Sequence, residues 1–414
     1  TNFSHFPLSV FPHIHCIVSR GVPTEKYLTN GVFEFDQAKA LVQEGCEVVF
    51  LALDLRSIRR TRRWGLHTFT KQGVRVVELS VPLGNIPKAM FYPLGKLALR
   101  RLYRKAVKLY GRPDLLHAHF TDYAYLASLL ADEEKLPLVV TEHSSLVNRQ
   151  LLPADIEKPA KAAYRRADCL IAVSPALAVR MQQHSGRKVE WVPDMVDTNL
   201  FAYSDSRERQ RAWMEETQTE EEGCSFTFLS CGNLRKVKRM DLLIRAFAQA
   251  FRESPQVSLT ICGQGEEEGA LRRLIAELGM EQRIELAGLR PREEIAKRLA
   301  QTDCFVLASE SETFGVSYLE ALSCGVPVIA TRCGGPECFV NEHNGIMVET
   351  GNVDALARAM LTIYCNIDFY NRPAIAQEVR RVYSSQAVAR SLIRQYENLL
   401  DSRETQLEKE AVCR

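Results

Sequence analysis

Residues 309–325, S-E-S-E-T-F-G-V-S-Y-L-E-A-L-S-C-G, decide how the fold and the chemistry of this chain are interpreted. A short apolar run, 304–307, precedes them and predicts a buried strand. The loop that follows carries Glu312. A short helix should then begin at about Val316 and end near Gly325, a residue type common just after helix ends. Strand, loop and helix in this order form the unit from which open parallel sheets are built.

The start of this helix predicts an anion site. In an open parallel sheet, ligands bind at the carboxyl ends of the strands, and this loop lies at such an end. The N–H groups of Gly315, Val316 and Ser317 would face the site, and helix N-termini bind anions such as a diphosphate. Glu320, about one turn into the helix, can accept two hydroxyl hydrogen bonds from a ribose. Glu312 would lie beyond the phosphates, where a sugar would bind.

The same alternation of apolar runs and amphipathic stretches extends over most of the chain. The expected strands form two series, 15–19, 48–52, 74–79, 115–117, 138–141 and 169–173, then 227–231, 258–262, 283–286, 304–307, 327–330 and 345–348. Helical patterns lie between them, which is typical of parallel sheets covered on both faces. Two series in 414 residues predict an α/β protein of two doubly wound domains.

The domain boundary should fall between residues 193 and 225. The stretch 204–223 is strongly charged and poor in large apolar residues, and it could hold a surface helix, 207–216, followed by an acidic loop. We therefore expect an N-terminal domain over 1–195 and a C-terminal domain over 196–375. The last stretch, 376–414, has helical spacing and no strand after it, so we expect it to return to the first domain.

The composition excludes several classes of protein. The formal net charge is only +2, so charge alone does not indicate a nucleic-acid-binding protein. No apolar run approaches the roughly 20 residues of a membrane-spanning helix, and residues 1–12 lack the features of a signal peptide. The 12 cysteines are scattered without a C-x-x-C pair. We expect small buried thiols in a cytoplasmic protein, and no zinc or other metal site.

Residues 94–110 predict a basic amphipathic helix, within a region (55–113) that carries 15 Lys and Arg against one acid. The expected apolar side holds Leu94, Ala98, Leu99, Leu102, Tyr103, Ala106, Leu109 and Tyr110, and the basic side holds Lys96, Arg100, Arg101, Arg104, Lys105 and Lys108. Two interpretations stay open: a solvated surface helix, or a helix that docks on anionic lipid headgroups or an anionic acceptor. Docking would make the protein peripheral on the inner face of the membrane. We expect no nucleic-acid partner, because no recognition motif accompanies the charge.

The ordered set of motifs resembles a known family. The string E-T-F-G-V-S-Y-L-E-A, 312–321, resembles the E-x7-E signature of the retaining group 1 glycosyltransferases (glycosyltransferase family 4). Further segments resemble this family's hinge and loop motifs: 192–201 (V-P-D-M-V-D-T-N-L-F), 232–241 (G-N-L-R-K-V-K-R-M-D), 262–265 (C-G-Q-G), 331–336 (T-R-C-G-G-P) and 344–345. The resemblance implies the GT-B fold, in which two Rossmann-like domains face each other across a cleft.

For the donor site, the resemblance implies that Lys238 pairs with the diphosphate of a nucleotide sugar and that Gly263 belongs to a loop beside it. Two positions depart from the family pattern. Asn233 stands where the family has an arginine, and Arg239 stands where it has a glycine after the lysine. Arg235 or Arg239 would then have to supply the missing charge.

The first domain matches the family more loosely. Gly31 stands where many relatives have a Gly-Gly pair, and it would let the backbone approach a diphosphate or a sugar closely. The segments 117–122 (H-A-H-F-T-D) and 141–145 (T-E-H-S-S) end two expected strands and resemble acceptor-side and sugar-side motifs. His143 is therefore the expected site residue of this domain, with His119 second.

The resemblance implies a metal-independent, retaining hexosyltransferase without a cofactor. A UDP-sugar is the first expectation for the donor and GDP-mannose the second, and the acceptor would be a glycan or a lipid-linked glycan, as in bacterial surface polysaccharide synthesis. No D-x-D pair, common in metal-using transferases, occurs in the sequence. Alternatives are a GT-B sugar-nucleotide epimerase, and a degenerate transferase kept as a binding subunit. A nicotinamide dehydrogenase should carry G-x-G-x-x-G after its first strand, where this chain has S-R-G-V-P-T-E, 19–25.

Overall fold

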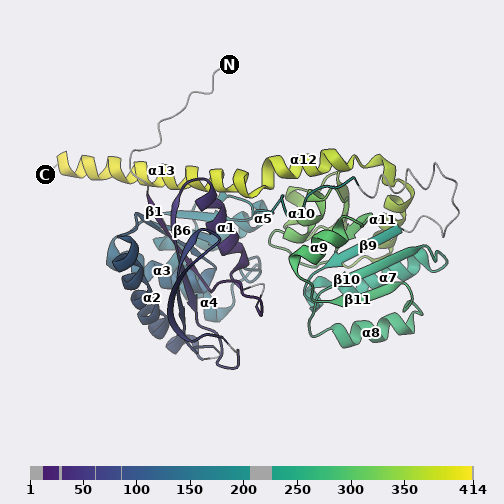
Figure 1. The fold of residues 1–414 in the computed structure, drawn as a ribbon, viewed down its shortest axis with the longest axis horizontal. Helices are drawn as coiled ribbons and strands as arrows, with labels where there is room; N and C mark the ends of the chain where they lie inside the picture. The colour runs from purple at the N-terminus through teal and green to yellow at the C-terminus, as the bar shows by residue number, and fades with distance from the viewer. Residues whose placement is uncertain (1–12, 28–29, 61, 85, 206–225, 413–414) are drawn as a thin grey trace, which may run out of the picture. The chain divides into compact units, whose positions relative to one another are not determined.

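The computed structural model describes residues 13–27, 30–60, 62–84, 86–205 and 226–412 (Figure 1). The chain divides into two compact units, which we call unit 1 (1–173, 178–192 and 388–414) and unit 2 (174–177 and 193–387). Each unit is built on a largely parallel sheet with helices on both faces, so the expected pair of Rossmann-like domains is confirmed. The expected helix 207–216 and the loop after it lie outside the described residues.

Unit 1 has an eight-stranded sheet in the order β3-β4-β2-β1-β5-β6-β7-β8. Its strands are β1 Ile14–Ser19, β2 Glu47–Asp54, β3 Gly65–Lys71, β4 Val74–Ser80, β5 Leu115–His119, β6 Leu138–Glu142, β7 Cys169–Ala172 and β8 Glu190–Trp191. All pair in parallel except β3, which forms an antiparallel hairpin with β4. The hairpin turns at Gln72 and Gly73, whose φ angles of 49° and 84° are those of a tight two-residue turn.

The helices of unit 1 lie on the two faces of this sheet. They are α1 Val32–Gln43, α2 Lys88–Tyr110, α3 Thr121–Glu134, α4 Ala154–Arg166, α5 Pro175–Ser185 and the C-terminal α13 Ser385–Val412. Helix α3 packs against α2 and α4. Phe35 of α1 contacts Phe50 of β2, and Tyr396 of α13 contacts His15 of β1. Ile17 pairs with Phe50 in register, and His15, two residues before Ile17, points to the same face of the sheet. Helices α1 and α13 therefore cover the same face.

Helix α2 begins six residues before the expected start at 94, and its packed side is narrower than expected. The side chains that it buries are Leu99, Leu102, Tyr103 and Ala106, next to Gly95. Leu94 and Leu109, expected on the packed side, are 38% and 43% exposed. Lys96 and Arg100, expected among the solvated cations, instead pair with Glu133 of α3 at 2.7 and 2.5 Å.

Unit 2 has a fully parallel six-stranded sheet in the order β11-β10-β9-β12-β13-β14. Its strands are β9 Phe226–Cys231, β10 Val257–Cys262, β11 Ile284–Gly288, β12 Cys304–Val306, β13 Val328–Thr331 and β14 Gly345–Val348. Its helices are α7 Met240–Phe251, α8 Glu268–Glu277, α9 Arg292–Leu299, α10 Val316–Ser323, α11 Val353–Cys365 and α12 Arg372–Tyr383, with short 3-10 turns at Lys236–Lys238, Pro336–Cys338 and Ile367–Phe369. Counted along the unit, the strand order is 3-2-1-4-5-6, that of dinucleotide-binding sheets.

The C-terminal stretch returns to unit 1 later than the expected residue 376, at Val388. Helix α12 stays with unit 2 because Arg372, at its first residue, is buried and donates from Nε to the carbonyl of Gly325 and from Nη2 to that of Thr302, both at 3.1 Å. Helix α13 then provides Tyr396 to the core of unit 1. Within the described residues, no helix is both long and apolar enough to cross a membrane.

Candidate functional site

The strand order locates the ligand-binding edge of unit 2. Strands β9 and β12 are neighbours, and the chain leaves them in opposite directions across the sheet. The loops after two such strands diverge and leave a crevice at their carboxyl ends, where ligands bind in this class of sheet. The two loops are residues 232–239 and 307–315, which contain most of the expected donor-site residues.

Lys238 and Glu312, one from each loop, form a direct ion pair. The Lys238 ammonium lies 2.5 Å from Glu312 Oε1, and their side chains are only 22% and 10% exposed. Ser309 Oγ donates to the same carboxylate oxygen at 2.7 Å. The Glu312 N–H donates to the carbonyl of Cys333 at 3.2 Å, so both the backbone and the side chain of Glu312 are held in place.

The start of α10 has the geometry of an anion site. Gly315 precedes the helix with a φ of 98°, a left-handed conformation that favours glycine, and a Cβ there would lie 2.8 Å from the ring of Tyr318. The Tyr318 hydroxyl donates to the carbonyl of Leu307 at 3.1 Å and ties the helix to the end of β12. The N–H groups of Val316 and Ser317, in the first turn, have no intrahelical carbonyl to bind.

Glu320, on the same helix, is held by an arginine that sequence reasoning did not identify. Arg292 Nη2 lies 3.3 Å from Glu320 Oε1, and the Glu320 side chain is 15% exposed. The Arg292 guanidinium also lies 5.4 Å from the ring centroid of Phe201. A signal for Arg292 exists in the sequence, because it directly follows Pro291 at the start of α9, after the carboxyl end of β11.

Asn233, Arg235 and Arg239, the three positions discussed for the missing arginine, differ in their surroundings. Arg239 pairs with Asp241 at 3.1 Å and with Glu310 at 2.5 Å. Its hydrogen bonds to Asp241 are the main reason why the pKa of its guanidinium is raised. Asn233 and Arg235 are exposed. Within the described residues Arg235 has no carboxylate partner, so this placement favours Arg235 over Arg239 as the cation that replaces the missing arginine.

Gly263 lies where two loops of the edge touch. A Cβ at this position would lie 1.9 Å from the carbonyl oxygen of Gly232, so glycine allows the loops after β9 and β10 to meet. Cys231 and Cys262 end these two strands in register. A hydrogen bond between their thiols is the main cause of the lowered pKa of Cys262 and of the raised pKa of Cys231.

In unit 1, the expected histidines end neighbouring strands. His119 ends β5, and its Nδ1 lies 3.0 Å from Nε2 of His143, which follows β6. Both side chains are almost fully buried, and burial is the main reason why the pKa of His119 lies well below its ordinary value. His119 is therefore neutral at neutral pH. Gly31 precedes α1 at the end of the loop after β1, the strand that neighbours β5.

Glu142 positions this part of unit 1, and sequence reasoning did not single it out. Its carboxylate is fully buried. Oε2 accepts hydrogen bonds from the hydroxyls of Thr121 and Tyr164, at 2.7 and 2.8 Å. Oε1 accepts from the N–H groups of His143 and Ser144, at 3.1 and 2.9 Å. The carboxylate thus fixes the turn that carries His143.

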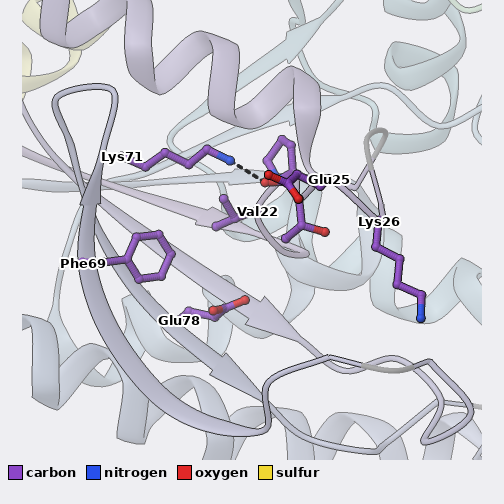
Figure 2. Close-up of a pocket in the computed structure, with 8 residues that line it drawn as sticks. Val22, Glu25, Lys26, Phe69, Lys71 and Glu78 are labelled. Atoms are coloured by element: carbon purple, nitrogen blue, oxygen red, sulfur yellow. Dashed lines mark hydrogen bonds between the residues drawn. The ribbon is translucent and has the colours of Figure 1, made fainter. Parts of the chain in front are cut away.

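A cavity of about 450 Å³ opens beside the loop after β1 (Figure 2). Its walls are residues 22–26 of this loop, Phe69 and Lys71 of β3, and Glu78 of β4. The Lys71 ammonium crosses to the carbonyl of Pro23 at 2.5 Å and joins the loop to the hairpin. Sequence reasoning did not predict this cavity. In the part of the chain that the structure describes, no three His, Cys, Asp or Glu side chains gather as metal ligands do.

Two family profiles match consecutive parts of the chain. "Glycosyltransferase Family 4" matches residues 32–200, and "Glycosyl transferases group 1" matches residues 213–380. Together they cover most of both units, and they include every residue considered above for the donor site.

Similar proteins of known sequence are named for a glucosaminyl malate, a phosphatidylinositol mannoside and a lipopolysaccharide core. N-acetyl-alpha-D-glucosaminyl L-malate synthase of Bacillus anthracis is 25% identical over 293 residues, 69% of this chain and 74% of its own length. GDP-mannose-dependent alpha-(1-6)-phosphatidylinositol monomannoside mannosyltransferase of Mycolicibacterium smegmatis is 31% identical over 238 residues, 54% and 59% of the two chains. Lipopolysaccharide core biosynthesis glycosyltransferase LpsE of Rhizobium meliloti is 29% identical over 213 residues, 51% and 58%. The chain thus matches under two thirds of the length of the last two.

Solved structures confirm the fold. Sucrose-phosphate synthase from Thermosynechococcus elongatus superposes with a TM-score of 0.77 at 20% identity, over 94% of this chain and 100% of its own. Anabaena HepE in complex with UDP-glucose superposes with a TM-score of 0.69 at 21% identity, over 93% and 100%. Their likeness extends over both units of this chain.

Proposed function

The chain belongs to the group 1 glycosyltransferases, and we propose that it is a retaining, metal-independent hexosyltransferase. It moves a sugar from a nucleoside diphosphate to a hydroxyl group of a glycan or of a lipid-linked glycan. The observation that carries this proposal is the arrangement at the carboxyl edge of unit 2. There the Lys238–Glu312 ion pair and the start of α10 come together around the two central strands.

In this proposal unit 2 holds the donor. Glu320 accepts hydrogen bonds from the ribose hydroxyls, and the N–H groups of Val316 and Ser317 bind the diphosphate. Lys238 turns from Glu312 toward the diphosphate, and Glu312 then accepts hydrogen bonds from the sugar. Fixed donors and a cation aimed at the leaving diphosphate stabilise the negative charge that develops as the glycosidic bond breaks.

We propose that the sugar is transferred by attack of the acceptor on one face of the anomeric carbon. The acceptor oxygen bonds to the anomeric carbon on the face that the diphosphate leaves, so the configuration is retained. The bond between the anomeric carbon and the phosphate oxygen breaks, and the diphosphate takes the proton of the acceptor hydroxyl. His143 lies in unit 1 as a hydrogen-bonding group, next to the neutral His119. We propose that it orients the acceptor or the sugar.

A UDP-sugar is the donor that we propose first and GDP-mannose the second. HepE, which shares the fold, binds UDP-glucose, whereas the Mycolicibacterium smegmatis relative uses GDP-mannose, as their names state. The relatives that act on glycolipids and lipopolysaccharide favour an acceptor of that kind and a role in bacterial surface polysaccharide or glycolipid synthesis.

We also propose that α2 docks on an anionic membrane surface where such an acceptor lies. The solvent-exposed side of α2 carries apolar residues toward its N-terminus, Met90, Leu94 and Leu97, and cations toward its C-terminus, Arg101, Arg104 and Lys108. Apolar side chains that enter the headgroup region and cations that meet anionic lipid both favour binding. Replacing Met90, Leu94 and Leu97 by Ser should reduce co-sedimentation with anionic vesicles by about tenfold. Unchanged co-sedimentation would leave α2 as a solvated surface helix.

A donor screen tests the proposed activity. The chain is incubated with each of the six common nucleotide sugars, and nucleotide release and sugar transfer to a glycan pool are followed. One donor should be consumed with transfer to an acceptor. Conversion of a UDP-sugar to its epimer without acceptor would indicate an epimerase. Donor binding without turnover would indicate a binding subunit, and no binding at all would reject the donor site.

A further inference from the structure

The loop between β2 and β3 is the most basic loop of the described chain. Residues 55–64, L-R-S-I-R-R-T-R-R-W, hold five arginines and no acid. The loop starts at the carboxyl end of β2, on the same edge of unit 1 as the loops that carry Gly31 and His143. Five like charges so close together repel one another, so the loop gains stability from any anion that binds among them.

Three cations converge on one aromatic ring beside this loop. The ring centroid of Tyr27 lies 5.9 Å from the ammonium of Lys26, 5.0 Å from the guanidinium of Arg56 and 5.4 Å from that of Arg60. Cations gather over the electron-rich face of a ring, which arranges them as a cradle. Tyr27 and Lys26 belong to the loop after β1, so two loops build this cradle together.

One carboxylate, that of Asp54, offsets part of the positive charge of the cradle and the loop. Asp54, at the end of β2, is shared by Arg56 at 2.6 Å and Arg62 at 3.1 Å. Lys26, Arg59, Arg60 and Arg63 form no ion pair within the described residues.

Two N–H groups of the Arg62 guanidinium have no hydrogen-bond acceptor in the described part of the chain. Its side chain is 8% exposed, and Nε and Nη1 are buried without an acceptor in the described part of the chain. Buried guanidinium donors without an acceptor are costly, and a ligand oxygen would satisfy them.

The cavity of Figure 2 adjoins the cradle, because Lys26 belongs to both. Glu78 lines it as a partly buried carboxylate that accepts no hydrogen bond from the described residues. The Phe69 ring lies on the same face of the β3–β4 hairpin as Glu78 and is 37% exposed. A carboxylate that can accept from hydroxyls and a ring that can pack on C–H groups suit a polyhydroxylated ring next to the anion.

We propose that this cradle and cavity bind an acceptor that carries a phosphomonoester or phosphodiester, with its phosphate among Lys26, Arg56 and Arg60 and its hydroxyl-bearing part in the cavity. The inference rests on the proposed transferase function, because it names the chemical class of the acceptor. It is distinct from the donor site, whose diphosphate binds on unit 2. The phosphate group belongs either to a soluble sugar phosphate or to a lipid headgroup.

The test measures phosphate binding by calorimetry in the presence of saturating UDP, which occupies the donor site. The probes are glycerol 3-phosphate, with glycerol as its uncharged control, and vesicles of phosphatidylcholine with phosphatidic acid. The test variant carries Lys26→Gln and Arg60→Gln, two exposed side chains that lack ion pairs, and so it should fold. Arg273→Gln, an exposed arginine of unit 2, is the matched control for a lost charge.

The wild type should bind glycerol 3-phosphate but not glycerol, and the double variant should bind it about tenfold more weakly, with Arg273→Gln unchanged. Binding of the vesicles alone, weakened in the double variant although its helix α2 is unchanged, would assign the phosphate to a lipid. Equal binding of both probes by the wild type and the double variant, or no binding by the wild type, would overturn the proposal. UDP binding is read separately, so a chain that binds phosphate but no nucleotide would refute the proposed function and leave the anion site intact.

Discussion

Replacing Lys238 by Met should separate stability from catalysis at the donor edge. The change removes the ammonium and keeps most of the side-chain volume. It removes the ion pair of Lys238 with the Glu312 carboxylate, whose side chain is 10% exposed. Ser309 still donates to Oε1 at 2.7 Å, but one neutral hydrogen bond does not replace an ion pair.

The magnitude follows from the geometry of the pair. Two unit charges 2.5 Å apart attract by about 7 kcal/mol at an effective dielectric constant of about 20. Desolvation of both groups offsets most of this attraction, whereas removal of one partner leaves a poorly solvated charge. Because the Lys238 side chain is 22% exposed, water enters partly, and we expect Lys238→Met to lower the free energy of unfolding by about 2–4 kcal/mol.

The double variant Lys238→Met with Glu312→Gln should recover most of that loss, because the largely buried negative charge at residue 312 is then removed as well. Turnover should fall by at least about 100-fold in both Lys238→Met and the double variant, because both lack the cation that stabilises the leaving group. Calorimetric unfolding measures the stabilities, and nucleotide release measures turnover.

Lys236→Met is the matched control, because Lys236 is exposed on the same 3-10 turn. It should leave both stability and turnover near the wild-type values. The reasoning would be refuted if Lys238→Met kept normal turnover. It would also fail if the double variant were as unstable as Lys238→Met, since the pair would then not be coupled.

Three further predictions concern other parts of the molecule. Glu320→Ala should weaken nucleotide binding by about 10- to 100-fold in calorimetry, because charged hydrogen bonds to the ribose are lost. The control Glu293→Ala should bind as the wild type does. Equal nucleotide affinities of Glu320→Ala and the wild type would reject the ribose role of Glu320. Gly315→Ala should lower the free energy of unfolding by about 1–3 kcal/mol, because alanine is strained at this φ and its Cβ meets the Tyr318 ring. An unchanged free energy of unfolding in denaturant titration would count against the left-handed conformation of Gly315. Burial lowers the pKa of His15 to about 4, below the value of about 6.5 in the unfolded chain. The folded state therefore favours the neutral imidazole by about 3 kcal/mol. This stability is present above about pH 6.5 and is lost as the pH falls to about 4. The His15→Phe variant should have a free energy of unfolding, measured by urea titration, that changes less with pH between about 4 and 6.5. The same pH dependence as in the wild type would contradict this assignment.

The central strands were predictable from the sequence because they are buried on both faces. Runs such as 48–52 and 258–262 correspond to β2 and β10 within two residues at either end. The edge strand β3 was not predicted, since residues 68–70 are exposed and the single Phe69 among them does not make an apolar run. A strand at a sheet edge has only one neighbour, so its pattern is weak.

The faces of α2 could not be read from helical spacing alone. Lys96 and Arg100 belong to the polar side of the wheel, but Glu133 of α3 draws both toward the neighbouring helix. Leu94 and Leu97 stay exposed because α2 presents only a narrow stripe to the sheet. Tertiary partners of this kind are invisible to a pattern that treats one helix by itself.

The candidate site was predictable as a set of residues but not as a set of contacts. The ion pair joins Lys238 to Glu312 across 74 positions of sequence, and only the strand order brings β9 and β12 together. Arg292 and Glu142 act by binding other site residues. Glu142 lies within the segment 141–145 and Arg292 directly follows Pro291, but neither position indicates which residue the side chain binds. The cradle around Tyr27 combines two loops. Arg56 and Arg60 were counted within the basic region 55–113, whereas Lys26 comes from the other loop and was not.

Donor binding by isothermal calorimetry tests the central claim most directly. UDP, UDP-sugars and GDP-mannose are titrated into the wild type and into Glu320→Ala, with no acceptor present. We predict saturable binding of one nucleotide sugar at or below about millimolar concentration, weakened in the Glu320→Ala variant. The account would be contradicted if the wild type bound none of these nucleotides at that concentration, or if the variant bound the same donor equally well.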